Sequence, residues 1–377
     1  MARAVEDTLR AAIGAGVGID EPDGPPYDIR DAIRAVVEGE GLSAAAATRA
    51  MDAIMSGEVS GAQIGALVTA LRLRGETVDV ITGFARGMRQ HALKVTPRLD
   101  GGPLVDTCGT GGDASGTFNI STTASFVIAG AGVRVAKHGN RAITSKCGSA
   151  DVLEGLGVAV ELTPDAVARC IDEVGIGFMY APAFHPAMRF VGPARREMGI
   201  RTVFNVLGPL TNPAGARHQL IGVGHPTIAP TLAEVLRELG SAHAVLVHAE
   251  EGLDELGLSG PSMVTEYDER RGDIRSYPIA PEDFGLARSG REAIAGGDVA
   301  TNVAITRRVL GGEPGPCRDV TLLNAGAGIY AADAAGSLAE GIDLARRSLD
   351  SGAAAAALDA LASMTQELAA APAGVPA

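Results

Sequence analysis

The apolar positions of the first hundred residues recur at the three- and four-residue spacing that is typical of amphipathic helices. This spacing predicts a helix over Ile29–Glu38, followed by three more. Ser43, Ser60 and Thr77 each stand just before an apolar periodic run, where a hydroxyl can cap the first turn of a helix. We therefore expect a small helical domain over residues 29–99.

After Gly101 the pattern changes to short β-rich runs separated by helix-like segments. The runs predict strands at 104–107, 134–136, 158–162, 220–223, 244–248 and 263–267. The segments between them predict helices at 122–131, 149–156, 164–173 and 228–239, and two Ala-rich helices are expected at 332–350 and 352–369. Alternating strands and helices indicate an α/β domain, with a central sheet flanked by helices, over residues 100–369. Residues 1–28 are expected to be a flexible extension, and residues 370–377 a tail.

Composition narrows the class of protein. Hydrophobic residues make up 46% of the chain and charged residues 20%, which suits a globular protein with a sizeable core. The net charge of −13 opposes a broad surface for nucleic acid or anionic membrane. The four cysteines form no CxxC pair, so we expect reduced thiols rather than a disulfide or a zinc site. No signal peptide pattern opens the chain and no apolar run approaches about 18 residues, so a cytoplasmic protein is expected.

A glycine-rich segment, Gly109-Thr-Gly-Gly-Asp113, directly follows an expected strand. Asn119-Ile-Ser-Thr122 then opens a helix. Backbone N–H groups of closely spaced glycines can approach an anion, and a helix N-terminus adds donors and a favourable dipole. The segment therefore predicts a phosphate-binding loop, although a glycine-rich turn by itself is more often only a turn. Its spacing fits neither the dinucleotide-binding GxGxxG motif nor the P-loop.

A second polar segment, Lys137-His-Gly-Asn-Arg141, follows another expected strand. In open α/β sheets ligands bind beyond the carboxyl ends of the strands, so these side chains would meet a phosphate held by the first loop. The alternative is a polar turn with solvated charges. Ser149 opens the next helix after a further glycine turn, where it would serve partly as structure and partly as a wall of the site.

Two adjacent carboxylates, Asp254 and Glu255, follow the strand expected at 244–248. If they face a cleft, they favour Mg²⁺, which binds one or two carboxylates together with phosphate and water oxygens. An acidic surface turn is the alternative. Arg195 lies in a segment that carries several arginines. An arginine turned into a cleft offers planar donors to a carboxylate, although helix arginines more often form solvated faces.

The motifs GTGGD, NIST, KHGNR, GSADVLE, RTVFNVLGPLTNP and GLDEL occur in this order. As an ordered set they resemble the anthranilate phosphoribosyltransferase family over residues 29–350. The resemblance implies a helical domain joined to an α/β domain, with the site in the cleft between them. It also implies that residues 182–200 pack onto the helical domain, through which a homodimer forms.

The activity implied by the resemblance is transfer of the phosphoribosyl group from phosphoribosyl pyrophosphate to the amine of anthranilate, a step of tryptophan biosynthesis that requires Mg²⁺. Phosphoribosyl pyrophosphate and anthranilate are then the expected partners, without nucleic acid or membrane. Because the amine of anthranilate is neutral at pH 7, no residue is expected to act as a general base.

The family's functional residues can be carried over to matching positions. The donor-binding set is Gly109, Thr110, Gly111, Gly112, Asp113, Thr117, Asn119, Ser121, Thr122, Lys137 and Ser149. The anthranilate-binding set is Gly109, His138, Asn140, His185, Arg195 and Gly208. Arg195 is expected to hold the carboxylate and Gly208 to be a close-packing position beside the substrate channel. The metal set is Ser121, Asp254 and Glu255, and Cys147 stands where the family more often has serine.

Two alternative functions remain at this stage. A pyrimidine nucleoside phosphorylase shares related loops and a related two-domain plan, but it would use free phosphate as the nucleophile. Arg195 and the RTVFNVLGPLTNP segment favour the transferase. A nonenzymatic relative that binds nucleic acid is the other alternative, and both the net charge and the Asp254-Glu255 pair oppose it.

Overall fold

The computed structural model describes residues 27–112, 115–142 and 146–370. Of the expected extension, residues 1–28, only Tyr27 and Asp28 are described, and of the expected tail only Ala370. The donor-site candidate Asp113 lies outside the described residues. No helix in the described ranges is long and apolar enough to cross a membrane.

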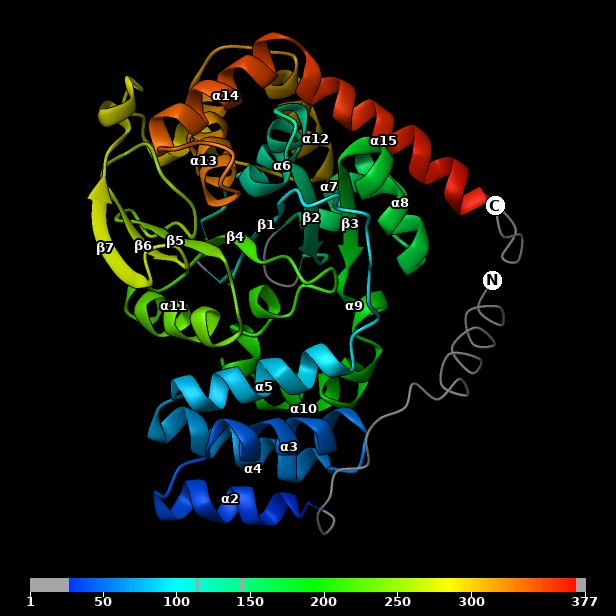
Figure 1. Ribbon diagram of the computed structural model, residues 1–377, viewed down its shortest axis with the longest axis vertical. Helices are drawn as coiled ribbons and strands as arrows, with labels where there is room; N and C mark the ends of the chain where they lie inside the picture. The colour runs from blue at the N-terminus through cyan, green and yellow to red at the C-terminus, as the bar shows by residue number, and fades with distance from the viewer. Residues whose placement is uncertain (1–26, 113–114, 143–145, 371–377) are drawn as a thin grey trace.

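Four helices follow one another from the start of the described chain and stack as a separate layer (Figure 1). They are α2 (Ile29–Glu38), α3 (Ala44–Met55), α4 (Gly61–Arg74) and α5 (Val78–Gln90). The predicted caps are confirmed: the hydroxyls of Ser43, Ser60 and Thr77 each accept a first-turn N–H at 3.3 Å. The first four predicted helices are therefore present, because local capping and periodicity agree with the tertiary packing.

A seven-stranded sheet forms the centre of the rest of the molecule, in the order β3-β2-β1-β4-β5-β6-β7. Its strands are β1 (Leu104–Gly109), β2 (Arg134–Gly139), β3 (Ile176–Tyr180), β4 (His218–Gly222), β5 (His243–Ala249), β6 (Ser262–Asp268) and β7 (Asp273–Ile279). β3, β2, β1, β4 and β5 are parallel, whereas β6 and β7 are antiparallel additions. The arrows of β2 and β3 point toward the helical layer, so the carboxyl ends of the parallel strands face it (Figure 1).

Helices cover both faces of the sheet, because buried parallel strands are apolar on both sides. α6 and α13 pack on one face, with α12, α14 and α15 outside them, while α8 and α11 pack on the other. The remaining helices are α6 (Ile120–Gly130), α7 (Ser149–Gly155), α8 (Pro164–Val174), α9 (Ala181–Phe184), α10 (Gly192–Met198), α11 (Ala229–Glu238), α12 (Val299–Leu310), α13 (Pro316–Ala331), α14 (Leu338–Asp350) and α15 (Ala353–Ala370).

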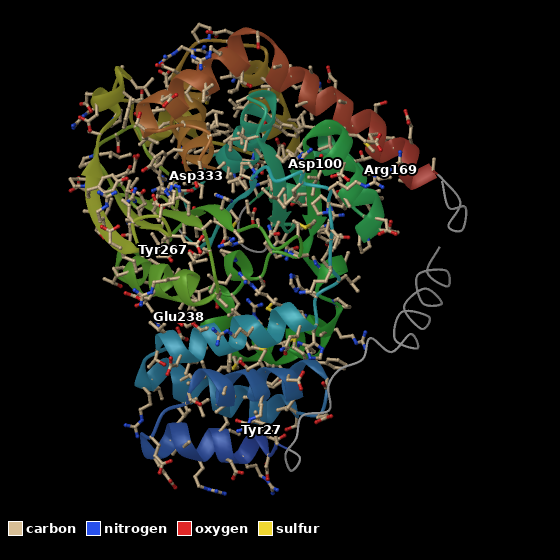
Figure 2. All side chains as sticks on the ribbon, viewed as in Figure 1. Tyr27, Asp100, Arg169, Glu238, Tyr267 and Asp333 are labelled. Carbon is tan, nitrogen blue, oxygen red and sulfur yellow. The ribbon has the colours of Figure 1, made fainter. Side chains whose placement is uncertain are left out.

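The side chains drawn in Figure 2 fill the space between these layers, and one apolar core runs from the helical layer through α11 to the sheet. Glu238, labelled in Figure 2, ends α11 on the side of the helical layer, and its carbonyl accepts from Arg86 of α5 at 2.9 Å. The segment after β3 also contacts this layer, because α10 packs on α4 and the 3-10 helix Pro186–Phe190 packs on α3.

The strand predicted at 158–162 is wrong. This segment connects α7 to α8, and Val158 and Val160 are buried against the core that includes α15. The short apolar, β-rich run that predicted a strand therefore packs against a helix, and it pairs with no strand in the described ranges. β2 pairs with β1 on one side and with β3 on the other, and the five residues of β3, which follow α8 almost directly, were not predicted as a strand.

Several further elements were not predicted, among them β7, α12 and α13. β7 is an edge strand with mostly exposed residues, so its sequence lacks the apolar pattern of a buried strand. α12 and α13 lie in a stretch for which no helix was expected. The helix expected at 332–350 is shorter than predicted, since α13 ends at Ala331 and α14 begins only at Leu338.

Two glycines allow α13 and α14 to touch at the backbone. A Cβ on Gly326 would lie 2.7 Å from the backbone nitrogen of Ile342, and a Cβ on Gly341 would overlap the carbonyl of Gly326. Close-packed interiors resist added methyl groups, so neither position has room for alanine.

We predict that Gly341→Ala lowers the free energy of unfolding by about 1–3 kcal/mol, because α14 must move away from α13. Gly65→Ala on α4 is the matched control, since its new Cβ would meet only Met198 Sδ at an ordinary 3.7 Å. That change should leave stability unchanged or raise it by about 0.5–1 kcal/mol through helix propensity. Urea unfolding of both variants checks this, and equal stabilities would contradict the close approach.

Candidate active site

The loop after β1 is held by backbone and side-chain hydrogen bonds from two directions. Thr110 N donates to Gly222 O of β4 at 2.8 Å, and its hydroxyl accepts from Gly224 N at 2.9 Å. Gly111 N donates to Asp254 Oδ2 at 2.9 Å, and Gly111 has a φ of +65°, which favours glycine. A Cβ on Gly109 would lie 2.5 Å from the same carboxylate oxygen. The glycines therefore let the loop lie directly against Asp254.

The second acidic residue contacts the start of α6. Ser121 N donates to Glu255 Oε1 at 3.2 Å, and the carbonyl of Ser121 accepts from the Thr107 hydroxyl at 3.3 Å. A carboxylate at a helix N-terminus interacts favourably with the helix dipole. Asp254 and Glu255 thus bind the two segments that the sequence marked as phosphate-binding, and they bring these segments together.

Lys137 lies at the same place, at the carboxyl end of β2. It is only 3% exposed, and its ammonium donates to Thr107 O at 2.6 Å and to Ser121 Oγ at 3.5 Å. Burial lowers the pKa of Lys137, while the carboxylates of Asp106 and Glu255 act in the opposite direction. A buried cation therefore stands beside the paired carboxylates and the hydroxyl of Ser121.

Asp106, on β1, was not among the predicted site residues, although it supports them. Its carboxylate is fully buried and accepts from His138 N at 3.2 Å and from Asn212 Nδ2 at 2.8 Å. Asn212 Nδ2 also donates to Ala136 O at 2.8 Å. A charged residue inside an apolar strand run was the signal that could have identified it, because a buried carboxylate needs hydrogen-bond partners.

Two histidines face each other between β2 and the segment after β3. The ring centres of His138 and His185 are 5.0 Å apart, and His138 Nδ1 lies 3.2 Å from Gly208 O. His138 Nε2 and both ring nitrogens of His185 make no hydrogen bond of normal geometry with the described part of the chain. Burial lowers the pKa of both rings, and that of His185 falls to about 3. The pair is therefore neutral at physiological pH, with polar nitrogens that a ligand can use.

Arg195, on α10, is half-buried, and its guanidinium lies 5.7 Å from the centre of the Phe204 ring. Burial lowers the pKa of Arg195, whereas Arg196 is exposed. Gly208 begins the 3-10 helix Gly208–Leu210. Gly208 was expected to be a close-packing position, but no other part of the described chain packs closely against it, because a Cβ there would meet nothing within 4 Å. Its carbonyl, bonded to His138, is instead its contact with the site.

The other candidates lie at the margin of this group. Ser149 Oγ donates to Asn140 O at 3.0 Å, which joins the start of α7 to the loop after β2. Thr117 forms an isolated antiparallel bridge with Ala295, and its hydroxyl lies 3.2 Å from that of Ser115. Thr122, in the first turn of α6, is only 2% exposed, which leaves little of its side chain for a ligand.

Two further residues that were not predicted as site residues contact the site, Arg201 at the start of the RTVFNVLGPLTNP motif and Asn302 outside all the motifs. Arg201, which follows α10, donates to Gly111 O at 3.3 Å and to Gly112 O at 3.4 Å. Asn302, on α12, donates to Asn119 Oδ1 at 2.9 Å. Spacing along the chain does not reveal such contacts, because they join segments that only the folded protein brings together.

A second group of ionisable side chains lies at the opposite end of the strands. Ligand atoms of His243, Glu266 and Asp268 lie within 4.8 Å of one another, but all three side chains are already paired within the described chain. His243 contacts Glu266 at 3.0 Å and Asp333 at 2.8 Å. Arg270 and Arg271 pair with the carboxylates, and a cavity of about 400 Å³ opens beside Asp333, which is labelled in Figure 2. Internal pairing makes this group a structural ion-pair network rather than a metal site.

Comparison with known proteins places this geometry in a family. Residues 101–355 match the α/β domain of a glycosyl transferase family, and residues 30–92 match that family's helical bundle domain. The chain is 56% identical to the anthranilate phosphoribosyltransferase of Moorella thermoacetica, over 90% of this chain and 98% of the relative. It is 58% identical to that of Roseiflexus castenholzii, over 88% of this chain and 97% of the relative.

Solved structures agree with these relatives. The crystal structure of the anthranilate phosphoribosyltransferase from Thermus thermophilus has a TM-score of 0.84 and 46% identity, covering 89% of this chain and 99% of that one. The Saccharomyces cerevisiae enzyme in complex with phosphoribosyl pyrophosphate and Mg has a TM-score of 0.81 and 27% identity, covering 90% of this chain and 98% of that one. Both domains, in the same order, are therefore shared, and the chain belongs to the glycosyl transferase family and, within it, to the anthranilate phosphoribosyltransferases.

Proposed function

We propose that this protein transfers the phosphoribosyl group of phosphoribosyl pyrophosphate to the amine of anthranilate and releases pyrophosphate. The observation that carries the proposal is the convergence of Asp254 and Glu255 on Gly111 N and Ser121 N. Lys137 stands beside the same serine hydroxyl. Carboxylates, a buried cation and backbone donors at one point suit a polyanionic substrate that is bound together with a divalent cation.

On the donor side, Gly109, Thr110, Gly111, Gly112, Asn119, Ser121 and Lys137 would hold the phosphates and ribose, with Asp113, Thr117, Thr122 and Ser149 as further donor-binding proposals. Lys137 and the loop amides would stabilise the negative charge that develops on the departing pyrophosphate. Because these groups are fixed before reaction, they favour the transition state over the bound substrate.

The residues fit Mg²⁺, because Asp254, Glu255 and Ser121 offer the oxygen ligands that this ion prefers. Each carboxylate uses one oxygen to accept from a backbone N–H, which fixes its orientation at the loop. Bound Mg²⁺ supplies charge neutralisation on the pyrophosphate oxygens.

On the acceptor side, Arg195 would bind the carboxylate of anthranilate, and His138, His185, Asn140, Gly109 and Gly208 would line its site. The carboxylate needs a cationic partner in a partly buried place, and a neutral histidine pair does not compete with Arg195 for it. The amine of anthranilate is an effective nucleophile when neutral, so alignment with the anomeric carbon replaces general base catalysis. We further propose that the protein is cytoplasmic. We also propose that it forms a homodimer through the helical layer, and analytical sedimentation would test this oligomeric state.

The direct test is incubation of the protein with anthranilate, phosphoribosyl pyrophosphate and Mg²⁺ while anthranilate fluorescence is followed. Loss of fluorescence that depends on all components is expected. Phosphorolysis of a pyrimidine nucleoside, without any loss of anthranilate, would instead favour the related phosphorylase.

The double variant Asp254→Asn with Glu255→Gln should abolish turnover at ordinary Mg²⁺ concentration while the fold stays intact. The amide oxygens can still accept from Gly111 N and Ser121 N, but the negative charge that binds the metal is lost. Turnover across a Mg²⁺ titration, together with thermal unfolding, checks the prediction. Unchanged turnover at low Mg²⁺ would remove the metal assignment.

Arg195→Ala should raise the KM for anthranilate at least roughly tenfold, which is the size of one lost charged hydrogen bond, and change the KM for the donor little. Arg196→Ala is the matched control. The Arg196 side chain is exposed, so this substitution should change neither KM appreciably. Steady-state kinetics of both variants with both substrates decides between them. A sensitive Arg196 would mean that the carboxylate contact is assigned to the wrong arginine.

His185 should also make the stability of the protein depend on pH. Its pKa is about 3 in the folded protein and 6.5 as the ordinary value, so the unfolded chain takes up the proton first. The stability due to this group is present above pH 6.5 and is lost, by about 1.4 kcal/mol per pH unit, as the pH falls toward 3.

Urea unfolding at pH 7 and pH 5 tests this dependence. The variant His185→Gln should lose less stability between the two pH values than the wild-type protein does. His225→Gln, at an exposed histidine, should lose as much as the wild type. Identical losses in all three proteins would show that His185 is not held neutral by burial.

A further inference from the structure

We propose that Asn302 is a positioning residue that orients the side-chain amide of Asn119 toward the phosphoribosyl donor. The inference rests on the proposed function, since it concerns the donor side of that site. Asn302 lies on α12, a helix that packs on α6 and α7 and carries none of the motifs described above.

Both ends of the Asn302 amide are used. It is only 2% exposed; Nδ2 donates to Asn119 Oδ1 at 2.9 Å, and Oδ1 accepts from Gly297 N at 2.8 Å. The bond to Gly297 fixes which end of the amide is the oxygen, so the end that faces Asn119 must be a donor. Burial raises the pKa of the Cys147 thiol, and a hydrogen bond from Asn302 opposes that rise. Asn302 thus contacts the segments before α6 and before α7.

The consequence for Asn119 is a single orientation. Its Oδ1 is taken by Asn302, so Nδ2 must point the other way, where it donates one hydrogen to Cys147 O at 3.2 Å. The second hydrogen of that nitrogen has no partner among the described residues and remains for a ligand oxygen.

The same contact prevents Asn119 from capping α6. An asparagine at this position usually accepts a first-turn N–H with its side-chain oxygen. The Asn119 side chain makes no such bond, because Asn302 holds the oxygen. The amide of Asn119 therefore serves as a donor that can reach a phosphate or ribose oxygen at the start of α6, rather than as a helix cap.

The variant Asn302→Asp separates this role from simple packing. A carboxylate can still accept from Gly297 N, but it cannot donate to Asn119 Oδ1, so the Asn119 amide must turn over or move away. We expect the Kd for phosphoribosyl pyrophosphate, measured by calorimetry, and the donor KM to rise roughly tenfold, with the anthranilate KM little changed.

Thr306→Val is the matched control. Thr306 lies one turn further along the same helix, is fully buried, and its hydroxyl lies 3.0 Å from that of Thr123 on α6. The Thr306→Val variant loses a comparable contact between α12 and α6 but leaves the contact with Asn119 intact. Its affinity for phosphoribosyl pyrophosphate should therefore stay within about twofold of the wild-type value, even if the stability of the protein falls. Asn302→Ala removes the same donor without burying a charge, and it replaces Asn302→Asp if that variant does not fold.

A double-mutant cycle with Asn119→Ala gives the decisive result, because a residue that acts only through Asn119 has no effect once the Asn119 amide is gone. The same loss of donor affinity in both backgrounds, or no loss in either, overturns the inference. Calorimetry keeps the two proposals apart. A wild-type protein that binds the donor without consuming anthranilate contradicts the proposed function alone, whereas one that does not bind the donor contradicts both.

Discussion

The site depends on one buried charge, the carboxylate of Asp106 in the middle of the sheet. A carboxylate without solvent must be surrounded by hydrogen-bond donors, and here those donors come from β2 and from Asn212. Satisfying this single group fixes β1, β2 and the segment around Gly208–Leu210 relative to one another. On β2, Lys137 then lies beside Thr107 and Ser121, and His138 lies beside Gly208.

The charged side chains around this point are also bonded to the backbone. Asp254 and Glu255 use backbone N–H groups, and the ammonium of Lys137 uses the carbonyl of Thr107. Hydrogen bonds with the backbone therefore help to orient each of these charged side chains. Groups that are oriented before a ligand binds need little reorganisation during a reaction.

The sequence predicted the helical layer and most of the parallel strands, because Ser43, Ser60 and Thr77 mark helix starts and the apolar runs are short and separated. It failed where packing at a distance decides the structure. Val158 and Val160 alternate like a strand but lie against α15, and β7 is too exposed to show a strand pattern. In the site, Asp254 and Glu255 were visible because a motif carries them. Asn302 lies in no motif, and the motif that begins with Arg201 did not show that this side chain contacts the loop after β1, because both contacts join segments far apart in the sequence.

The exposed strand β7 also has a consequence for the protein in a crowded solution. An open sheet edge is a template on which another chain can add a strand, and this is a common beginning of aggregation. β7 carries Pro278, which has no N–H to offer, and the charged side chains of Asp273 and Arg275. β7 is therefore a poor partner for a further strand, which disfavours growth of a larger β-structure from this edge of the sheet.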